Sequence, residues 1–248
     1  MALTQLGSAA EVLVATGHDP FARGSLRRPF VHGWLADGAV AWLGTDAEER
    51  LPRLSALGEP AAVAALVADL LPELPPRQRT TLPRGTAALL PAWTGLDGWA
   101  DWDFRWRSSP PEPQAGEELV VAGVPDDDVA ALLARASPTP SAQAGDPAVR
   151  GWHGLLEDGR LLAVAADTSA ATGVGHVSSV AVAPEQRGRG LGRAVTAALT
   201  RSLLAGSCDV VTLGLYADNT AARAMYDALG FADDHRFTSG RLVQRTRW

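Results

Sequence analysis

The stretch PEQRGRGLGRAV, residues 184–195, alternates glycine with arginine or leucine directly before an amphipathic segment. The apolar residues of that segment recur at helical spacing: Leu191, Val195, Ala198, Leu199 and Leu203. We therefore expect a helix to begin near Gly190. The start of a helix presents unpaired N–H groups and the positive end of the dipole, and glycines let a ligand approach the backbone. The stretch predicts an anion site, and phosphate fits it best.

Two common phosphate-binding patterns fit this stretch poorly. A P-loop needs a Gly-Lys-Ser/Thr sequence, whereas all 22 basic residues of the chain are arginines. A dinucleotide fingerprint needs G-x-G-x-x-G early in a βαβ unit, with an acidic residue about 20 positions later at the end of a strand. Here the spacing is G-x-G-x-G, late in the chain, and Asp209 precedes a strand. A dinucleotide site is therefore disfavoured.

A third pattern fits better. Arg187-x-x-Gly190-x-Gly192, between the strand-like SVAVAP (179–184) and a helix, resembles the pyrophosphate-binding signature of the GNAT acetyltransferase superfamily. LGLYADNTAARAMYDALGF (213–231) resembles the second signature of that family. The resemblance covers Glu118 to about Leu242 and implies an α/β (α+β) fold of GNAT type. Such a fold has a mixed, mostly antiparallel sheet with flanking helices and a splayed parallel strand pair.

The resemblance also implies which residues meet the coenzyme. The loop residues that would bind the coenzyme A pyrophosphate through backbone amides are Arg187, Gly188, Arg189, Gly190, Leu191, Gly192 and Arg193. Backbone groups of the preceding strand would hold the pantetheine arm and polarise the thioester carbonyl; these belong to Val180, Ala181 and Val182. Asn219 would contact the arm, and the cap of its own helix is a compatible alternative role.

Two side chains are candidates for catalysis. Tyr226 matches the tyrosine that faces the departing thiol, and a buried core tyrosine is the alternative. His176 stands where many members place a glutamate that accepts the amine proton, and a structural histidine is the alternative. Cys208 lies away from both signatures and is expected to be inert.

The resemblance implies an N-acetyltransferase that uses acetyl-CoA as co-substrate and no metal. The acceptor is a small-molecule or peptide amine that attacks directly in a ternary complex. A catalytically inactive acyl-CoA sensor or interaction module is the alternative, since residues 1–107 carry neither signature. Trp93, Trp99, Trp102 and Trp106 in that half either line an acceptor cleft or fill a core.

The proline-rich segment RSSPPEPQAGEE (107–118) predicts a boundary between domains. We expect an N-terminal α/β domain over residues 1–107, a linker over 108–117 and the acetyltransferase domain over 118–248. The pattern His32-Gly33-x-Leu35-x-Asp37-Gly38 recurs from His153 to Gly159. Either the first half is a degenerate copy, or two Asp-Gly hairpins look alike. The two patterns are 121 residues apart, and the same spacing aligns the glycine stretch with LVADLL (66–71), which has no glycine.

Bulk properties narrow the class of protein. A formal net charge of -6 disfavours a nucleic-acid binder, which needs a basic surface. The single cysteine allows no internal disulfide, and the first twenty residues do not resemble a secretory signal. The apolar run from Ala61 is broken by Asp69 and is shorter than the ~20 residues that cross a bilayer. We expect a cytoplasmic protein without membrane or nucleic-acid partners.

Overall fold

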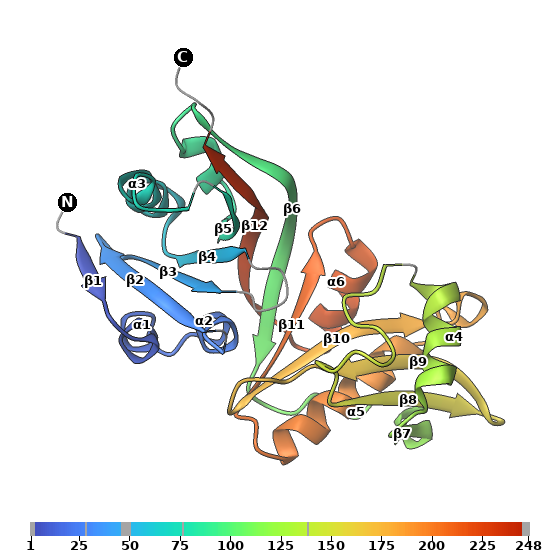
Figure 1. The fold of residues 1–248 in the computed structure, drawn as a ribbon. Helices are drawn as coiled ribbons and strands as arrows, with labels where there is room; N and C mark the ends of the chain where they lie inside the picture. The colour runs from blue at the N-terminus through green and yellow to red at the C-terminus, as the bar shows by residue number, and fades with distance from the viewer. Residues whose placement is uncertain (1–2, 28, 46–50, 76, 138, 245–248) are drawn as a thin grey trace. The chain divides into compact units, whose positions relative to one another are not determined.

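The computed structural model describes residues 3–27, 29–45, 51–75, 77–137 and 139–244. The chain folds into two compact units. The first contains Met1–Phe104, Tyr216–Asp218 and His235–Trp248, and the second contains Arg105–Leu215 and Asn219–Asp234. Each unit is a sheet with helices packed against it (Figure 1).

The sheet of the first unit has the strand order β1-β2-β3-β4-β5-β12-β6 (Figure 1). Its elements are β1 (Thr4–Leu6), α1 (Ala9–Ala15), α2 (Pro20–Ser25), β2 (Phe30–Ala36), β3 (Ala39–Thr45), β4 (Pro52–Leu57), α3 (Pro60–Leu70), β5 (Arg77–Pro83), β6 (Thr94–Arg107) and β12 (Asp233–Gln244). Strands β1 to β4 pair antiparallel, β4 and β5 pair parallel, and β5 and β12 pair antiparallel. The predicted hairpin at Asp37-Gly38 is confirmed, and the apolar run from Ala61 forms most of α3.

The sheet of the second unit has the order β11-β10-β9-β8-β7 (Figure 1). Its elements are β7 (Val120–Ala122), α4 (Asp126–Ala136), β8 (Gly151–Glu157), β9 (Arg160–Asp167), β10 (Val174–Val182), α5 (Leu191–Ala205), β11 (Val210–Tyr216) and α6 (Thr220–Ala228). Strands β7 to β10 pair antiparallel, and β10 and β11 pair parallel. The predicted mixed, mostly antiparallel sheet with one parallel pair is confirmed.

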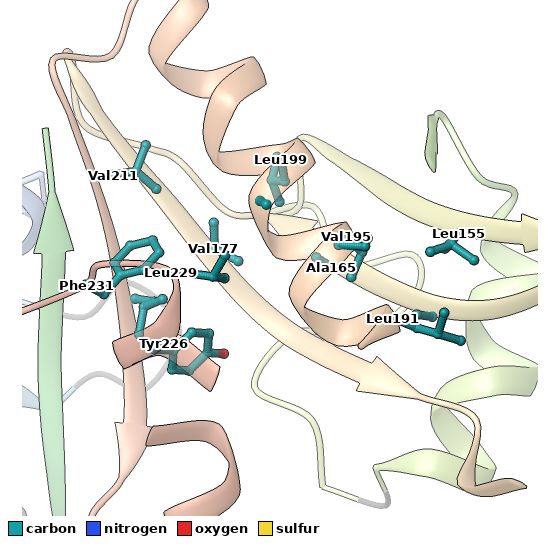
Figure 2. Close-up of a cluster of buried hydrophobic side chains, with 14 of the residues drawn as sticks. Leu155, Ala165, Val177, Leu191, Val195, Leu199, Val211, Tyr226, Leu229 and Phe231 are labelled. Carbon is teal, nitrogen blue, oxygen red and sulfur yellow. The ribbon is translucent and has the colours of Figure 1, made fainter. Parts of the chain in front are cut away.

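Helices α4 and α5 cover opposite faces of the second sheet. Ala165 and Val177 pack in one cluster with Leu199 of α5, whereas Val164 and Ala166 pack in another with Leu132 of α4. Neighbouring residues of β9 thus point to opposite faces, as the pleat of a strand requires. Tyr226 of α6 and Leu229, the C-cap of that helix, belong to the cluster on the α5 side (Figure 2).

The two units share one topology. The order β1-α1-α2-β2-β3-β4-α3-β5 corresponds to β7-α4-β8-β9-β10-α5-β11, and the corresponding strands pair with the same directions. Both hairpins turn through a left-handed aspartate, Asp37 at φ 47° and Asp158 at φ 50°. The shared topology favours duplication as the origin of the repeated pattern. The spacing between the two hairpins does not hold for the rest of the units. It aligns the glycine stretch with residues 66–71, which lie at the end of α3 and its C-cap and not in a loop before a helix.

The units do not coincide with the three segments expected from the sequence. Strand β12 lies largely in the first unit, because it pairs with β5 from Phe237↔Pro83 to Val243↔Arg77. Residues 108–116 belong to the second unit and are hydrogen-bonded to α5, because Nη1 of Arg201 in that helix donates to the Pro111 carbonyl at 2.8 Å.

The tryptophans of residues 93–102 have different surroundings in the first unit. Trp93 packs against the core beside α3, and the Trp102 ring lies 5.2 Å from the Phe237 ring. Trp99 is 62% exposed. Trp93 and Trp102 are therefore half-buried against core residues, and Trp99 faces solvent.

Candidate active site

Strands β10 and β11 separate part-way along their length. Their parallel register runs from Val174↔Val210 to Val177↔Leu213, and β10 continues beyond it to Val182. The pairing of β10 with β9 shifts between Ser178 and Ala181, which marks a β-bulge. Bulges bend the strand that carries them. The expected splayed pair is therefore present, with the bulge beside it.

The bulge is tied to the loop after α4. Ser179 has a φ of 46°, a conformation that costs most residues about 1–2 kcal/mol. Its hydroxyl accepts from the Ala142 N–H at 2.7 Å and donates to the Ala142 carbonyl at 2.9 Å. Ala142 itself is buried in the α4-side core. These bonds fix both the bulge and the middle of the proline-rich loop 137–147.

The glycine stretch forms an open helix start. Helix α5 begins at Leu191, as predicted, and its N-cap is Gly190 at φ 81° with no side-chain cap. Gly188 is also left-handed, at φ 82°. A Cβ added at either glycine would meet no atom within 4 Å. The first N–H groups of α5 are therefore uncapped by side chains, beside open space at the two glycines, and such a helix start favours an anion.

The side chains of two loop arginines bind other parts of the second unit. Arg189 Nη2 lies 2.8 Å from Glu157 Oε1, and this pair raises the pKa of Arg189 and lowers the pKa of Glu157. Arg187 donates to the Ala136 carbonyl at 3.0 Å. Both side chains thus help to hold the loop in place. Glu157 neutralises the charge of Arg189, whereas Arg187 keeps its full charge because its partner is a neutral carbonyl.

Helix α6 presents Tyr226 from the predicted position. Asn219 caps the helix, since its Oδ1 accepts from the Ala222 N–H at 3.0 Å, which confirms the capping role. The Tyr226 ring is buried 6.0 Å from the Phe231 ring (Figure 2). Burial raises the pKa of Tyr226 to about 12. The phenol therefore keeps its proton at neutral pH, so its hydroxyl can donate a hydrogen bond.

Two arginines that the sequence analysis missed hold the end of α6. Arg105 is 5% exposed, contacts Asp227 and donates to the Phe231 carbonyl at 3.0 Å. Arg107 donates to the Leu229 carbonyl, the C-cap of the helix. Cations at a helix C-terminus satisfy its last carbonyls and complement the dipole. They support the helix that carries Tyr226, and the sequence holds no local signal for this pairing.

His176 is held by residues that the sequence analysis also missed. Its Nδ1 lies 2.8 Å from Thr212 Oγ1, and its backbone N–H donates to Ser169 Oγ at 2.9 Å. His176 is half-buried and follows the strand alternation, so it lies on the face opposite Val177 and α5. A fixed, half-buried imidazole is suited to accept a proton near neutral pH.

Residues 104–231 match the model of the acetyltransferase (GNAT) family. The chain belongs to the GNAT acetyltransferase family. Enzymes of this family use acetyl-CoA as the acetyl donor.

Curated relatives of this GNAT protein are named mycothiol acetyltransferase. One from Tsukamurella paurometabola is 46% identical over 83 residues, which is 32% of this chain and 28% of the relative. One from Kocuria rhizophila is 51% identical over 63 residues, or 25% of this chain and 20% of the relative. The matched part thus spans less than a third of the curated relatives.

Solved structures share the fold of the GNAT chain. A protein from Novosphingobium aromaticivorans described as a GNAT acetyltransferase is 27% identical, with a TM-score of 0.54 over 79% of this chain and 89% of that chain. A GCN5-related N-acetyltransferase from Kribbella flavida is 23% identical, with a TM-score of 0.55 over 95% and 96% of the two chains. The second similarity extends over both units.

In this GNAT protein the two side chains that the sequence offers as catalytic candidates lie on opposite faces of the splayed strands. Tyr226 belongs to the α5-side cluster that includes Val177, and His176 lies on the other face. Among the described residues, no group of three His, Cys, Asp or Glu side chains could hold a metal ion. No helix in the described part of the chain is long and apolar enough to cross a membrane.

Proposed function

We propose that this GNAT acetyltransferase moves the acetyl group of acetyl-CoA to a primary amine by direct attack in a ternary complex. The observation that supports the donor is the start of α5, where Gly188 and Gly190 are left-handed, open and without a side-chain cap. We assign the coenzyme pyrophosphate to the backbone amides of residues 187–193 there.

The pantetheine arm is assigned to the gap that opens beside β10. Backbone groups of Val180, Ala181 and Val182 would bind it, and one of their amides would donate to the thioester carbonyl oxygen as it gains negative charge. The Asn219 cap uses Oδ1, so the contact with the arm is assigned to the amide nitrogen of the same side chain.

The chemical step then needs two side chains. The neutral amine attacks the thioester carbon, a C–N bond forms, and the C–S bond breaks with its electron pair on sulfur. His176 accepts the proton that the amine loses, and Tyr226 donates a hydrogen bond to the departing thiolate. No covalent acyl-enzyme is formed.

The acceptor is proposed to be a small molecule or a peptide with a primary amine. The name of the curated relatives, mycothiol acetyltransferase, makes a mycothiol-related amine the first acceptor to test. A panel of amino acids, polyamines and peptides with free N-termini extends the search.

The test mixes the purified chain with acetyl-CoA and each amine and follows the release of free thiol, with reactions lacking the amine as the control. We expect amine-dependent release with at least one acceptor and mass-spectrometric detection of the acetylated product. Thermal stabilisation by acetyl-CoA without turnover on any amine would instead support the inactive binding module. The position of Tyr226 favours the enzyme, because coenzyme binding alone does not need a leaving-group donor.

A further inference from the structure

The backbone of His176 is fixed on both sides. Its N–H donates to Ser169 Oγ at 2.9 Å, and its carbonyl accepts from the Thr168 N–H at 2.9 Å. The residue therefore has a defined place on β10 before its side chain is considered. The contact between the His176 ring and Thr212 then determines which ring nitrogen carries the proton.

The hydrogen bonds of Thr212 determine where the imidazole proton lies. The Thr212 hydroxyl has a single proton and donates it to the Gly175 carbonyl at 2.9 Å, an oxygen that can only accept. The contact between Thr212 Oγ1 and His176 Nδ1, at 2.8 Å, then requires the proton to be on Nδ1. In the reverse arrangement, the hydroxyl and carbonyl oxygens would face each other with no proton between them. Only the first arrangement satisfies both contacts.

We infer that Thr212 is a positioning residue that holds neutral His176 as the Nδ1–H tautomer, with the lone pair on Nε2. The assignment of Nε2 as the proton acceptor rests on the proposed function. When Nε2 accepts the amine proton, the Nδ1–H bond to Thr212 persists, so the charged ring keeps its partner and its orientation. Thr212 is 1% exposed, so water does not compete for this bond.

The tautomer can be observed without turnover. Long-range ¹H–¹⁵N spectra of the ¹⁵N-histidine-labelled chain, at a pH where the imidazole is neutral, distinguish a protonated from an unprotonated ring nitrogen. His176→Gln identifies the signals of this residue among the five histidines. We expect Nδ1 protonated and Nε2 unprotonated in the native chain, and a shift towards the Nε2–H form in Thr212→Val. A native Nε2–H form, or an unchanged spectrum in Thr212→Val, would overturn the inference.

Two control variants separate this role from packing. Thr212→Ser keeps the hydroxyl and should keep the native tautomer. Thr200→Val alters another fully buried threonine of the second unit, whose Oγ1 has no partner among the described residues, and should leave the His176 signals unchanged. A shift in the spectrum of either control would refute the role of the Thr212 hydroxyl.

Kinetics give the second readout. Thr212→Val should lower kcat about tenfold, part of the ~10²–10⁴-fold typical of general acid–base catalysis, and Thr212→Ser should restore most of it. The two proposals fail separately. An Nδ1–H tautomer in a chain that acetylates no amine would refute the proposed function alone, and turnover with an Nε2–H tautomer would refute the role of Thr212 alone.

Discussion

Replacing Tyr226 by phenylalanine removes the proposed hydrogen bond to the leaving thiolate and keeps the buried ring. Burial raises the pKa of this phenol to about 12. Full proton transfer to a thiolate whose conjugate acid has a pKa of about 8.5 would be uphill by about 3.5 units, or about 5 kcal/mol. Tyr226 therefore acts as a hydrogen-bond donor. Loss of a hydrogen bond to a charged group costs about 1.5–3 kcal/mol, so we expect kcat to fall about 10- to 100-fold.

The assay compares initial rates of thiol release by the native chain, Tyr226→Phe and Tyr216→Phe. Tyr216, the only other tyrosine, is 64% exposed, and its variant should lose less than about twofold, as surface changes usually do. A thioester with a more acidic leaving thiol needs less help, so the Tyr226→Phe defect should shrink with such a donor. An equal defect with both thioesters would refute a role at the leaving group.

Four further outcomes follow from the same contacts. The pKa of Tyr226 is higher in the folded chain than the value of about 10 in the unfolded chain, so the free energy of unfolding should fall by about 3 kcal/mol as pH rises from 10 to 12. Urea titrations of Tyr226→Phe should show less of this fall. Burial lowers the pKa of His153, so the unfolded chain binds more protons than the folded chain, and stability should decrease as pH falls below about 6.5. In His153→Gln the melting temperature should depend less on pH between 7.5 and 5.5. Ser179→Ala loses both bonds to Ala142 and keeps the strained φ, so it should unfold more easily than Ser179→Gly by about 1 kcal/mol. Gly190→Ala should cost about 1 kcal/mol in stability and raise KM for acetyl-CoA, whereas Gly190→Asn, which tolerates a positive φ, should cost less stability.

Local signals in the sequence predicted much of the second unit. Asp158-Gly159 forms a hairpin because both residues tolerate a positive φ. The apolar period after Gly190 located the start of α5 to within one residue of Leu191. The Asn219 cap also follows from local chemistry, since a short polar side chain can reach the first turn of its own helix.

Contacts between distant residues were not predictable in the same way. Thr212 meets His176 because β10 and β11 pair in one particular register, and nothing in either strand alone fixes that register. The side chain of Arg189 pairs with Glu157, which is 32 residues away in the sequence and which the fold brings beside it. Strand β4 was not predicted, because PRLSAL is short, begins with proline and holds no β-branched or aromatic residue of the kind that marks a strand.

The shared topology of the two units shows what the proposed coenzyme site requires beyond the fold. Only Gly58 and Glu59 connect β4 to α3, whereas residues 183–190 connect β10 to α5. A Cβ at Gly58 would lie 3.0 Å from both the Ala39 Cα and the Gly38 carbonyl oxygen, so the short connection packs directly against the hairpin. The longer connection leaves open space at Gly188 and Gly190. In the second unit the longer loop thus leaves the start of its helix open to an anion, whereas in the first unit the short connection packs the start of α3 against the hairpin.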